Sequence, residues 1–271
     1  MLNTNIMKKT FNKFKSDKLK HGYIDVYLSY LEKLKNKKLK ILEIGVADGK
    51  SIQAWSHYFK NSLIIGIDIK KIDLKKLNLK NKNIKILKGS QSDPRFISSL
   101  IKKYKNFDII IDDGSHFPND VISSFKMLFP SLSQNGYYFV EDTQTSYIHF
   151  FKGNPFDLKY SKTHINFFKE LVDRLNYQEI ANPFYRKSYY DGKIKSISFF
   201  HNILVLKKGL NEKKSNLVLN NSYENKRYLE KIRRNPDKQL MYFFKYKIFY
   251  KIYTLFLFTL NFLKKFILLR F

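Results

Sequence analysis

The sequence predicts a doubly wound α/β fold, with a mostly parallel sheet between two layers of helices. Short runs of apolar, β-branched residues alternate with helix-like segments through five predicted strands, and this alternation is typical of βαβ units. Several of these strands end in acidic side chains, and open α/β sheets bind ligands at the carboxyl ends of their strands. Two further β-rich runs near residue 200 predict a C-terminal β-hairpin, which brings the expected sheet to seven strands.

The individual elements follow from local patterns along the chain. Apolar side chains recur at helical spacing over residues 24–34, which indicates an amphipathic helix. Asp93 before Pro94 is typical of a capped helix start, and residues 134–136 read as a turn. The predicted strands are 39–44, 62–68, 84–87, 107–111, 137–140, 195–200 and 202–207, and the further predicted helices are 52–59, 94–103, 118–128 and 164–176.

The composition divides the chain into four expected segments. These are an N-terminal helical lead-in or lid (1–38), the main α/β domain (39–209), a polar linker (210–239) and a basic aromatic tail (240–271). The longest uncharged run of the tail, 252–263, would span about 18 Å as a helix, which is short of a ~30 Å hydrocarbon core. We therefore expect an amphipathic helix on an anionic membrane surface. A helix that packs on another protein, or on this one, is the alternative, and a single-pass anchor is less favoured.

The net charge of +28 is extreme and favours acidic partners such as nucleic acid, anionic lipid or a phosphorylated glycan. A general bias toward lysine is the competing explanation, because lysines are scattered along the whole chain. The absence of cysteine excludes disulfides, thiolate metal ligands and a cysteine nucleophile, and it fits a reducing cytosol. The N-terminus has no apolar core of a secretory signal.

Acidic side chains follow two predicted neighbouring strands at the point where each strand ends. Asp112, Asp113 and His116 follow strand 107–111, and Glu141 and Asp142 follow strand 137–140. Clustered carboxylates repel one another unless a cation lies among them. Oxygen ligands without cysteine suit Mg²⁺, or Mn²⁺, rather than zinc. The sequence therefore predicts a metal and general-base site, although His116 could also be a loop histidine that bonds the start of the next helix.

The first strand is followed by Glu43-x-Gly45-x-x-x-Gly49, whose glycines allow a tight turn and close approach to a ligand. The spacing differs from the G-x-G-x-x-G of nicotinamide enzymes, and a phosphate loop would need glycine where residue 44 is isoleucine. The pattern resembles motif I of class I S-adenosylmethionine-dependent methyltransferases. That resemblance implies a ribose contact at Asp68, for which a cap or turn role is the alternative. Implied adenine contacts follow the third strand, at Gln91, Ser92 and Asp93.

The two acidic strand ends, Asp112-Asp113-Gly-Ser-His116 and Glu141-Asp142-Thr-Gln-Thr-Ser-Tyr147, resemble the magnesium-dependent sugar O-methyltransferases of the mycinamicin and tetracenomycin pathways. Ser16-Asp17-Lys18, His21-x-Tyr23 and His201-Asn202 extend the resemblance, whereas the tail has no counterpart in it. The resemblance implies metal ligation by Asp113, Glu141 and Asp142, proton abstraction by His116, and a cofactor contact by Asp112. The substrate contacts that we expect are Asp17, His21, Tyr23, Gln144 and Tyr147.

The expected function is therefore Mg²⁺-assisted methyl transfer to a sugar hydroxyl, with a cell-surface glycan or lipid-linked saccharide as acceptor. A catechol-type O-methyltransferase acting on a small molecule is the main alternative. A nucleic-acid methyltransferase is less favoured, because the fourth strand ends in DDGSH and not in the Asn/Asp-Pro-Pro-aromatic pattern of enzymes acting on exocyclic amines. A membrane-binding protein without enzymatic activity would leave the acidic strand ends unexplained. We expect a cytoplasmic protein, peripheral on the inner face of the membrane, that forms a homo-oligomer.

Overall fold

The computed structural model describes residues 4–72, 83–180 and 185–211, and in the tail residues 252, 255–257 and 259–260. It divides into two compact units, 1–175 with 192–211 and 176–191 with 212–271, and the first unit contains the sheet. Most of the predicted linker (210–239) and of the predicted tail (240–271) lies outside the described residues. Among the residues that are described, no helix is both long and apolar enough to cross a membrane.

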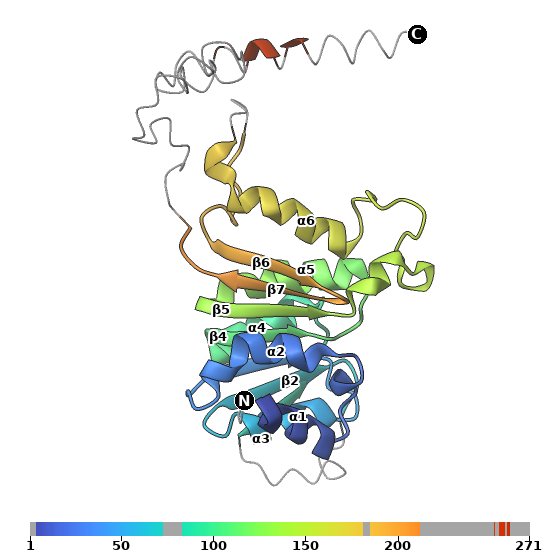
Figure 1. Ribbon diagram of the computed structural model, residues 1–271, viewed down its shortest axis with the longest axis vertical. Coiled ribbons are helices and arrows are strands. Elements are labelled where there is room, and N and C mark those ends of the chain that lie inside the picture. The colour runs from blue at the N-terminus through green and yellow to red at the C-terminus, as the bar shows by residue number, and fades with distance from the viewer. Residues whose placement is uncertain are drawn as a thin grey trace, which may run out of the picture. The chain divides into compact units, whose positions relative to one another are not determined.

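A seven-stranded sheet in the order β3-β2-β1-β4-β5-β7-β6 forms the centre of the first unit (Figure 1). The first five strands run parallel, and β7 lies antiparallel between β5 and β6. The predicted doubly wound sheet with its C-terminal hairpin is confirmed. The strands are β1 (Lys40–Ile44), β2 (Leu63–Asp68), β3 (Ile84–Lys88), β4 (Phe107–Asp112), β5 (Leu132–Glu141), β6 (Ile194–Phe200) and β7 (Ile203–Lys208).

Helices pack on both faces of this sheet. Side chains of α1, α2 and α3 share one buried cluster with Ile109 and Ile111 of β4. Successive residues of a strand point to opposite faces of the sheet, so Tyr138 of β5 lies on the other face. There Phe125 of α5 packs against it, with the two ring centres 5.1 Å apart. The helices are α1 (Thr4–Lys13), α2 (Tyr23–Leu31), α3 (Lys50–Tyr58), α4 (Pro94–Tyr104), α5 (Pro118–Leu128) and α6 (His164–Leu175).

The N-terminal lead-in is part of the same compact unit as the sheet. Phe11 of α1 and Tyr27 of α2 both pack edge-on against Trp55 of α3, at ring distances of 4.6 and 4.9 Å. The sequence pattern indicated the second of these helices but not α1. The division of the chain into four segments stays a prediction.

The predicted turn at residues 134–136 is wrong, because these residues lie inside β5. The pairing of β5 with β4 shifts register between Phe107 and Ile109, and Asn135 has a positive φ of 64°. A bulge of this kind places turn-type residues within a strand without ending it. Beyond it the register is regular, and Asp112 pairs with both Ile44 of β1 and Val140 of β5. The carboxyl ends of β1, β4 and β5 are therefore level with one another.

Candidate active site

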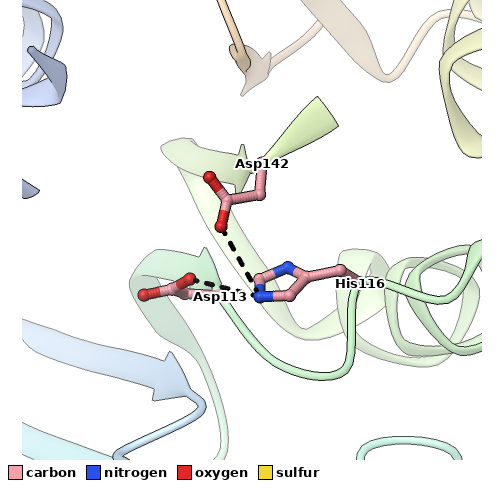
Figure 2. A group of neighbouring side chains, drawn as sticks. All are labelled: Asp113, His116 and Asp142. Atoms are coloured by element: carbon pink, nitrogen blue, oxygen red, sulfur yellow. Dashed lines mark ion pairs between the residues drawn. The ribbon is translucent and has the colours of Figure 1, made fainter. Parts of the chain in front are cut away.

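Asp113, His116 and Asp142 meet at the carboxyl ends of β4 and β5 (Figure 2). Nε2 of His116 lies 3.6 Å from Oδ2 of Asp142 and 3.9 Å from Oδ1 of Asp113. Each side chain can place one ligand atom within 4.8 Å of the others, and all three are partly exposed. Hard divalent cations favour carboxylate oxygens and keep several waters, so two partly exposed carboxylates fit a Mg²⁺ ion that keeps further coordination positions free.

Glu141, the third predicted ligand, is paired with the buried Lys18, whose ammonium also contacts Asp113. Its side chain is 2% exposed, and Oε1 accepts hydrogen bonds from Nζ of Lys18, at 2.7 Å, and from the hydroxyl of Tyr27. The group that the described residues form around His116 does not include it. Metal ligation by Glu141 stays a prediction, and the structure presents it as the partner of a buried lysine.

Lys18 is the site residue that the sequence analysis missed. Its side chain is only 1% exposed, and Nζ lies 2.5 Å from Oδ2 of Asp113 and 3.5 Å from Oε1 of Glu43. Burial lowers the pKa of Lys18, but the charges of Asp113, Glu141 and Glu43 outweigh it, so this pKa lies well above its ordinary value. The Ser-Asp-Lys motif was the only signal for this residue, and lysine is among the residues least often buried.

Two predicted substrate contacts hold Asp142 in place. The hydroxyl of Tyr23 donates to Oδ1 of Asp142 at 2.6 Å, and Nε2 of Gln144 donates to the same oxygen at 3.2 Å. Burial raises the pKa of Asp142, but these two hydrogen bonds and the His116 imidazole outweigh it, so this pKa is lowered. Asp142 is therefore held as a carboxylate, the form that binds a metal.

The other three predicted substrate residues are His21, Asp17 and Tyr147. The His21 ring is 5.3 Å from the Tyr23 ring. Asp17 begins the short 3₁₀ turn that carries Lys18. Tyr147 ends the 3₁₀ turn Thr143–Tyr147 and is 39% exposed. Their substrate roles stay predictions.

A pocket beside the metal group contains three of the predicted cofactor residues, Gly45, Asp68 and Gln91. Gly45 has a φ of +87°, and a Cβ atom there would lie 2.0 Å from the carbonyl oxygen of Asp113. Oδ2 of Asp68 accepts from the backbone nitrogens of Val46 and Ala47 at 2.9 and 3.0 Å, which fixes the turn after β1. Glycine at position 45 lets the backbone of the turn after β1 pass close to the backbone of Asp113, which a side chain would prevent.

Two predicted cofactor acids, Glu43 and Asp112, are buried. Glu43 accepts a hydrogen bond from Nε1 of Trp55 at 3.2 Å, and burial raises its pKa to about 7. Asp112 accepts from Ser124, Tyr138 and Gln91, and burial raises its pKa to about 6. Neither acid is among the described residues that line this pocket. Asp112 supports the pocket wall through its hydrogen bond from Gln91, whereas Glu43 is bonded to Trp55. Direct cofactor contacts by both acids stay predictions.

The remaining predicted cofactor residues shape the loops near the pocket. Gly49 stands at the N-terminus of α3 with a φ of 75°. Asp93 caps α4 by accepting from the backbone nitrogen of Arg95 at 2.9 Å, which confirms the predicted helix start. Oγ of Ser92 lies 3.0 Å from Oγ of Ser90, a residue of the pocket lining. Direct cofactor contacts by Gly49, Ser92 and Asp93 stay predictions.

No protein-family model matches the chain, but individual relatives do. It is 32% identical to demethylmacrocin O-methyltransferase of Streptomyces fradiae over 199 residues, which cover 70% of this chain and 49% of that enzyme. It is 31% identical to mycinamicin VI 2''-O-methyltransferase of Micromonospora griseorubida over 200 residues, which cover 71% and 49%. The chain therefore spans about half the length of the curated relatives it matches.

A similar solved structure is the MycE methyltransferase of the mycinamycin biosynthetic pathway, in complex with Mg and SAH. The TM-score is 0.74 at 27% sequence identity, over 83% of this chain and 60% of that one. The sequence and structural comparisons thus lead to the same group of O-methyltransferases. The chain has the class I methyltransferase fold, and over about 70% of its length it is a relative of sugar O-methyltransferases from antibiotic biosynthesis.

Proposed function

We propose that the protein is an S-adenosylmethionine-dependent O-methyltransferase that acts on a sugar hydroxyl with the help of Mg²⁺, or of Mn²⁺, which suits the same ligands. The observation that carries the proposal is the contact between Gly45 and the backbone of Asp113. It joins the cofactor pocket directly to the acidic group around His116. A methyl donor in that pocket and an acceptor hydroxyl at that group would therefore be neighbours. The Mg and SAH bound to the related MycE methyltransferase support both ligands.

Each residue of the group has a chemical role in this proposal. Asp113 and Asp142 would hold the metal, and Glu141 would join them by giving up its hydrogen bonds from Lys18 and Tyr27. The bound metal would lower the pKa of the acceptor hydroxyl and align it. Nε2 of His116 would accept the hydroxyl proton, which for a well-positioned base contributes ~10²–10⁴-fold in rate. The deprotonated oxygen would then attack the methyl carbon of the sulfonium, whose carbon–sulfur bond would break to release S-adenosylhomocysteine.

Binding calorimetry with S-adenosylhomocysteine, with and without Mg²⁺, tests this assignment. We expect wild type to bind both ligands, and we expect Asp142→Ala and Asp113→Ala to keep the nucleoside while losing the metal. Asp157→Asn, in an exposed loop, serves as the matched control that changes neither. Failure of wild type to bind S-adenosylhomocysteine would overturn the proposal as a whole.

For the acceptor we propose a cell-surface glycan or lipid-linked saccharide, reached at the inner face of the cytoplasmic membrane through the tail. Support comes from the uncharged run 252–263 between Lys251 and Lys264, and from Ile252 and Phe256, which are 60% and 59% exposed. Apolar side chains flanked by lysines fit an anionic bilayer interface. The cytoplasm also agrees with the absence of cysteine, and a homo-oligomer stays a prediction.

Vesicle sedimentation tests this membrane proposal. We expect the full chain to sediment with phosphatidylglycerol vesicles but not with phosphatidylcholine vesicles, and Phe256→Glu to weaken that binding. Turnover on a soluble acceptor should be unchanged by this substitution. Equal sedimentation of wild type and variant would exclude the tail as the membrane contact.

A further inference from the structure

A second pocket is lined by the residues that directly follow His116 in the sequence and by residues of the loop 152–162. Its walls include Phe117, Asn119, Asp120, Lys152, Tyr160 and Lys162. Asp120 also lines the cofactor pocket, so the two pockets have a wall in common. The ring of Phe151 is 6.1 Å from the His116 ring and 5.6 Å from the Phe117 ring. The ring of Phe151 therefore lies between the proposed base and Phe117 of the second pocket.

The loop that supplies one side of this pocket is held by several hydrogen bonds. Oδ1 of Asn154 accepts from the backbone nitrogens of Phe156 and Asp157, both at 2.9 Å. Nδ2 of Asn166 donates to the carbonyl oxygens of Leu158 and Tyr160 at 3.0 and 2.8 Å. The backbone from Phe156 to Tyr160, in the middle of this loop, is therefore held in place by these bonds, which reduces the entropy lost on binding.

Gly153 anchors the start of the same loop. It is buried, and a Cβ atom there would lie 2.4 Å from the carbonyl oxygen of Thr145. The preceding residue, Lys152, has a positive φ of 61°, a backbone conformation typical of turns. Nζ of Lys152 lies 5.9 Å from the centre of the Phe117 ring. The pocket thus sets an ammonium group beside an aromatic face.

The pocket carries a net positive charge. Lys152 and Lys162 are both exposed, and none of the ion pairs within the described part of the chain involves either ammonium. The one acid in the lining, Asp120, already accepts a hydrogen bond from Oγ of Ser115 at 2.7 Å. Two lysines against one engaged carboxylate favour an anionic ligand.

We infer that the acceptor is a sugar that carries a phosphate or diphosphate, with the sugar at Phe117 and Tyr160 and the phosphate at Lys152 and Lys162. This inference rests on the proposed function and narrows its acceptor. Aromatic walls offer apolar surface to a sugar ring, and a few placed polar groups fix its orientation. Lysine is a common phosphate ligand. Nucleotide-linked and lipid-linked sugars share this chemistry.

Calorimetry without divalent metal, at low salt, tests the inference with three probes. UDP-glucose and farnesyl diphosphate represent the two sources of diphosphate, and methyl glucoside is the neutral comparison. We expect one or both diphosphates to bind at least tenfold more tightly than methyl glucoside, and the tighter of the two identifies the source. Raising the salt should weaken this binding, because exposed charges are screened.

Three variants make the test specific to the pocket. Lys152→Ala and Lys162→Ala should each weaken diphosphate binding about tenfold, the size expected for a lost hydrogen bond to a charged group. Lys159→Ala, an exposed lysine of the same loop outside the described lining, should leave it unchanged. Equal binding of all three probes, or an equal loss in Lys159→Ala, would overturn the inference.

The same preparations separate this inference from the proposed function. S-adenosylhomocysteine binding that persists while diphosphate binding is absent overturns the anionic acceptor alone. Diphosphate binding without S-adenosylhomocysteine binding would instead overturn the methyltransferase assignment.

Discussion

Nζ of Lys18 lies 2.7 Å from Oε1 of Glu141, across 123 positions of sequence. This buried pair ties the N-terminal segment to the carboxyl end of β5. Glu43 and Asp113 lie at 3.5 and 2.5 Å from the same ammonium, so one lysine faces three carboxylates. The excess negative charge of such a cluster is balanced either by a further cation or by protonation of a carboxylate, and burial raises the pKa of Glu43 to about 7. The group around His116 lies next to this cluster, because both include Asp113.

Lys18→Met should lower the free energy of unfolding by about 3–5 kcal/mol, because the substitution leaves buried carboxylates uncompensated. Lys8→Met removes an exposed pair with Asp25 and should cost less than about 1 kcal/mol. Urea denaturation of both variants at pH 7 compares them. A Lys18→Met midpoint equal to that of wild type would show that the buried pair adds nothing to stability.

His116→Gln should lower kcat by ~10²–10⁴-fold, as expected when a positioned base is lost. If His116 acts as the base, the variant should bind Mg²⁺ as wild type does, and a metal titration by calorimetry measures this. His149→Gln, at an exposed histidine, is the matched control and should retain full turnover. Loss of metal affinity in His116→Gln would instead make this residue a ligand.

Gly45→Ala and Gly22→Ala separate a steric clash from backbone strain. Both glycines have positive φ, but an added Cβ meets nothing within 4 Å at Gly22, whereas at Gly45 it meets the Asp113 carbonyl. We expect about 1 kcal/mol of destabilisation at Gly22 and a loss at least about 2 kcal/mol larger at Gly45. Thermal unfolding and S-adenosylhomocysteine binding measure both effects. Equal losses in the two variants would remove the steric argument.

His164 should make the fold less stable in acid. Burial lowers the pKa of His164 to about 4, below its ordinary value near 6.5, so between these values the unfolded chain binds the additional proton. Its contribution to stability is complete above pH 6.5 and is lost as pH falls toward 4, by about 2 kcal/mol at pH 5. His164→Gln removes this titrating group, so the amount by which wild type is more stable than the variant should shrink as pH falls from 7.5 to 5. A difference independent of pH would contradict the shift.

The sequence predicted those parts of the fold that depend on local pattern. Helix 118–128 was placed with its observed ends, because Pro118 starts it and apolar residues recur at helical spacing. The burial of Lys18 could not be predicted, because its partners lie 95 and 123 positions away and no local periodicity encodes them. The same holds for Glu141, whose place at a strand end was correctly predicted while its orientation depends on Lys18 and Tyr27.

Asp120 stands in the walls of both pockets, and Ser115 connects it to the cofactor side. Oγ of Ser115 donates to Asp120, and the backbone nitrogen of Ser115 donates to Oε1 of Gln91 at 2.8 Å. A ligand that moved Asp120 in one pocket would therefore also change the wall of the other. Thermodynamic linkage then requires reciprocity: whatever factor the methyl donor applies to the affinity for the acceptor, the acceptor applies to the affinity for the donor.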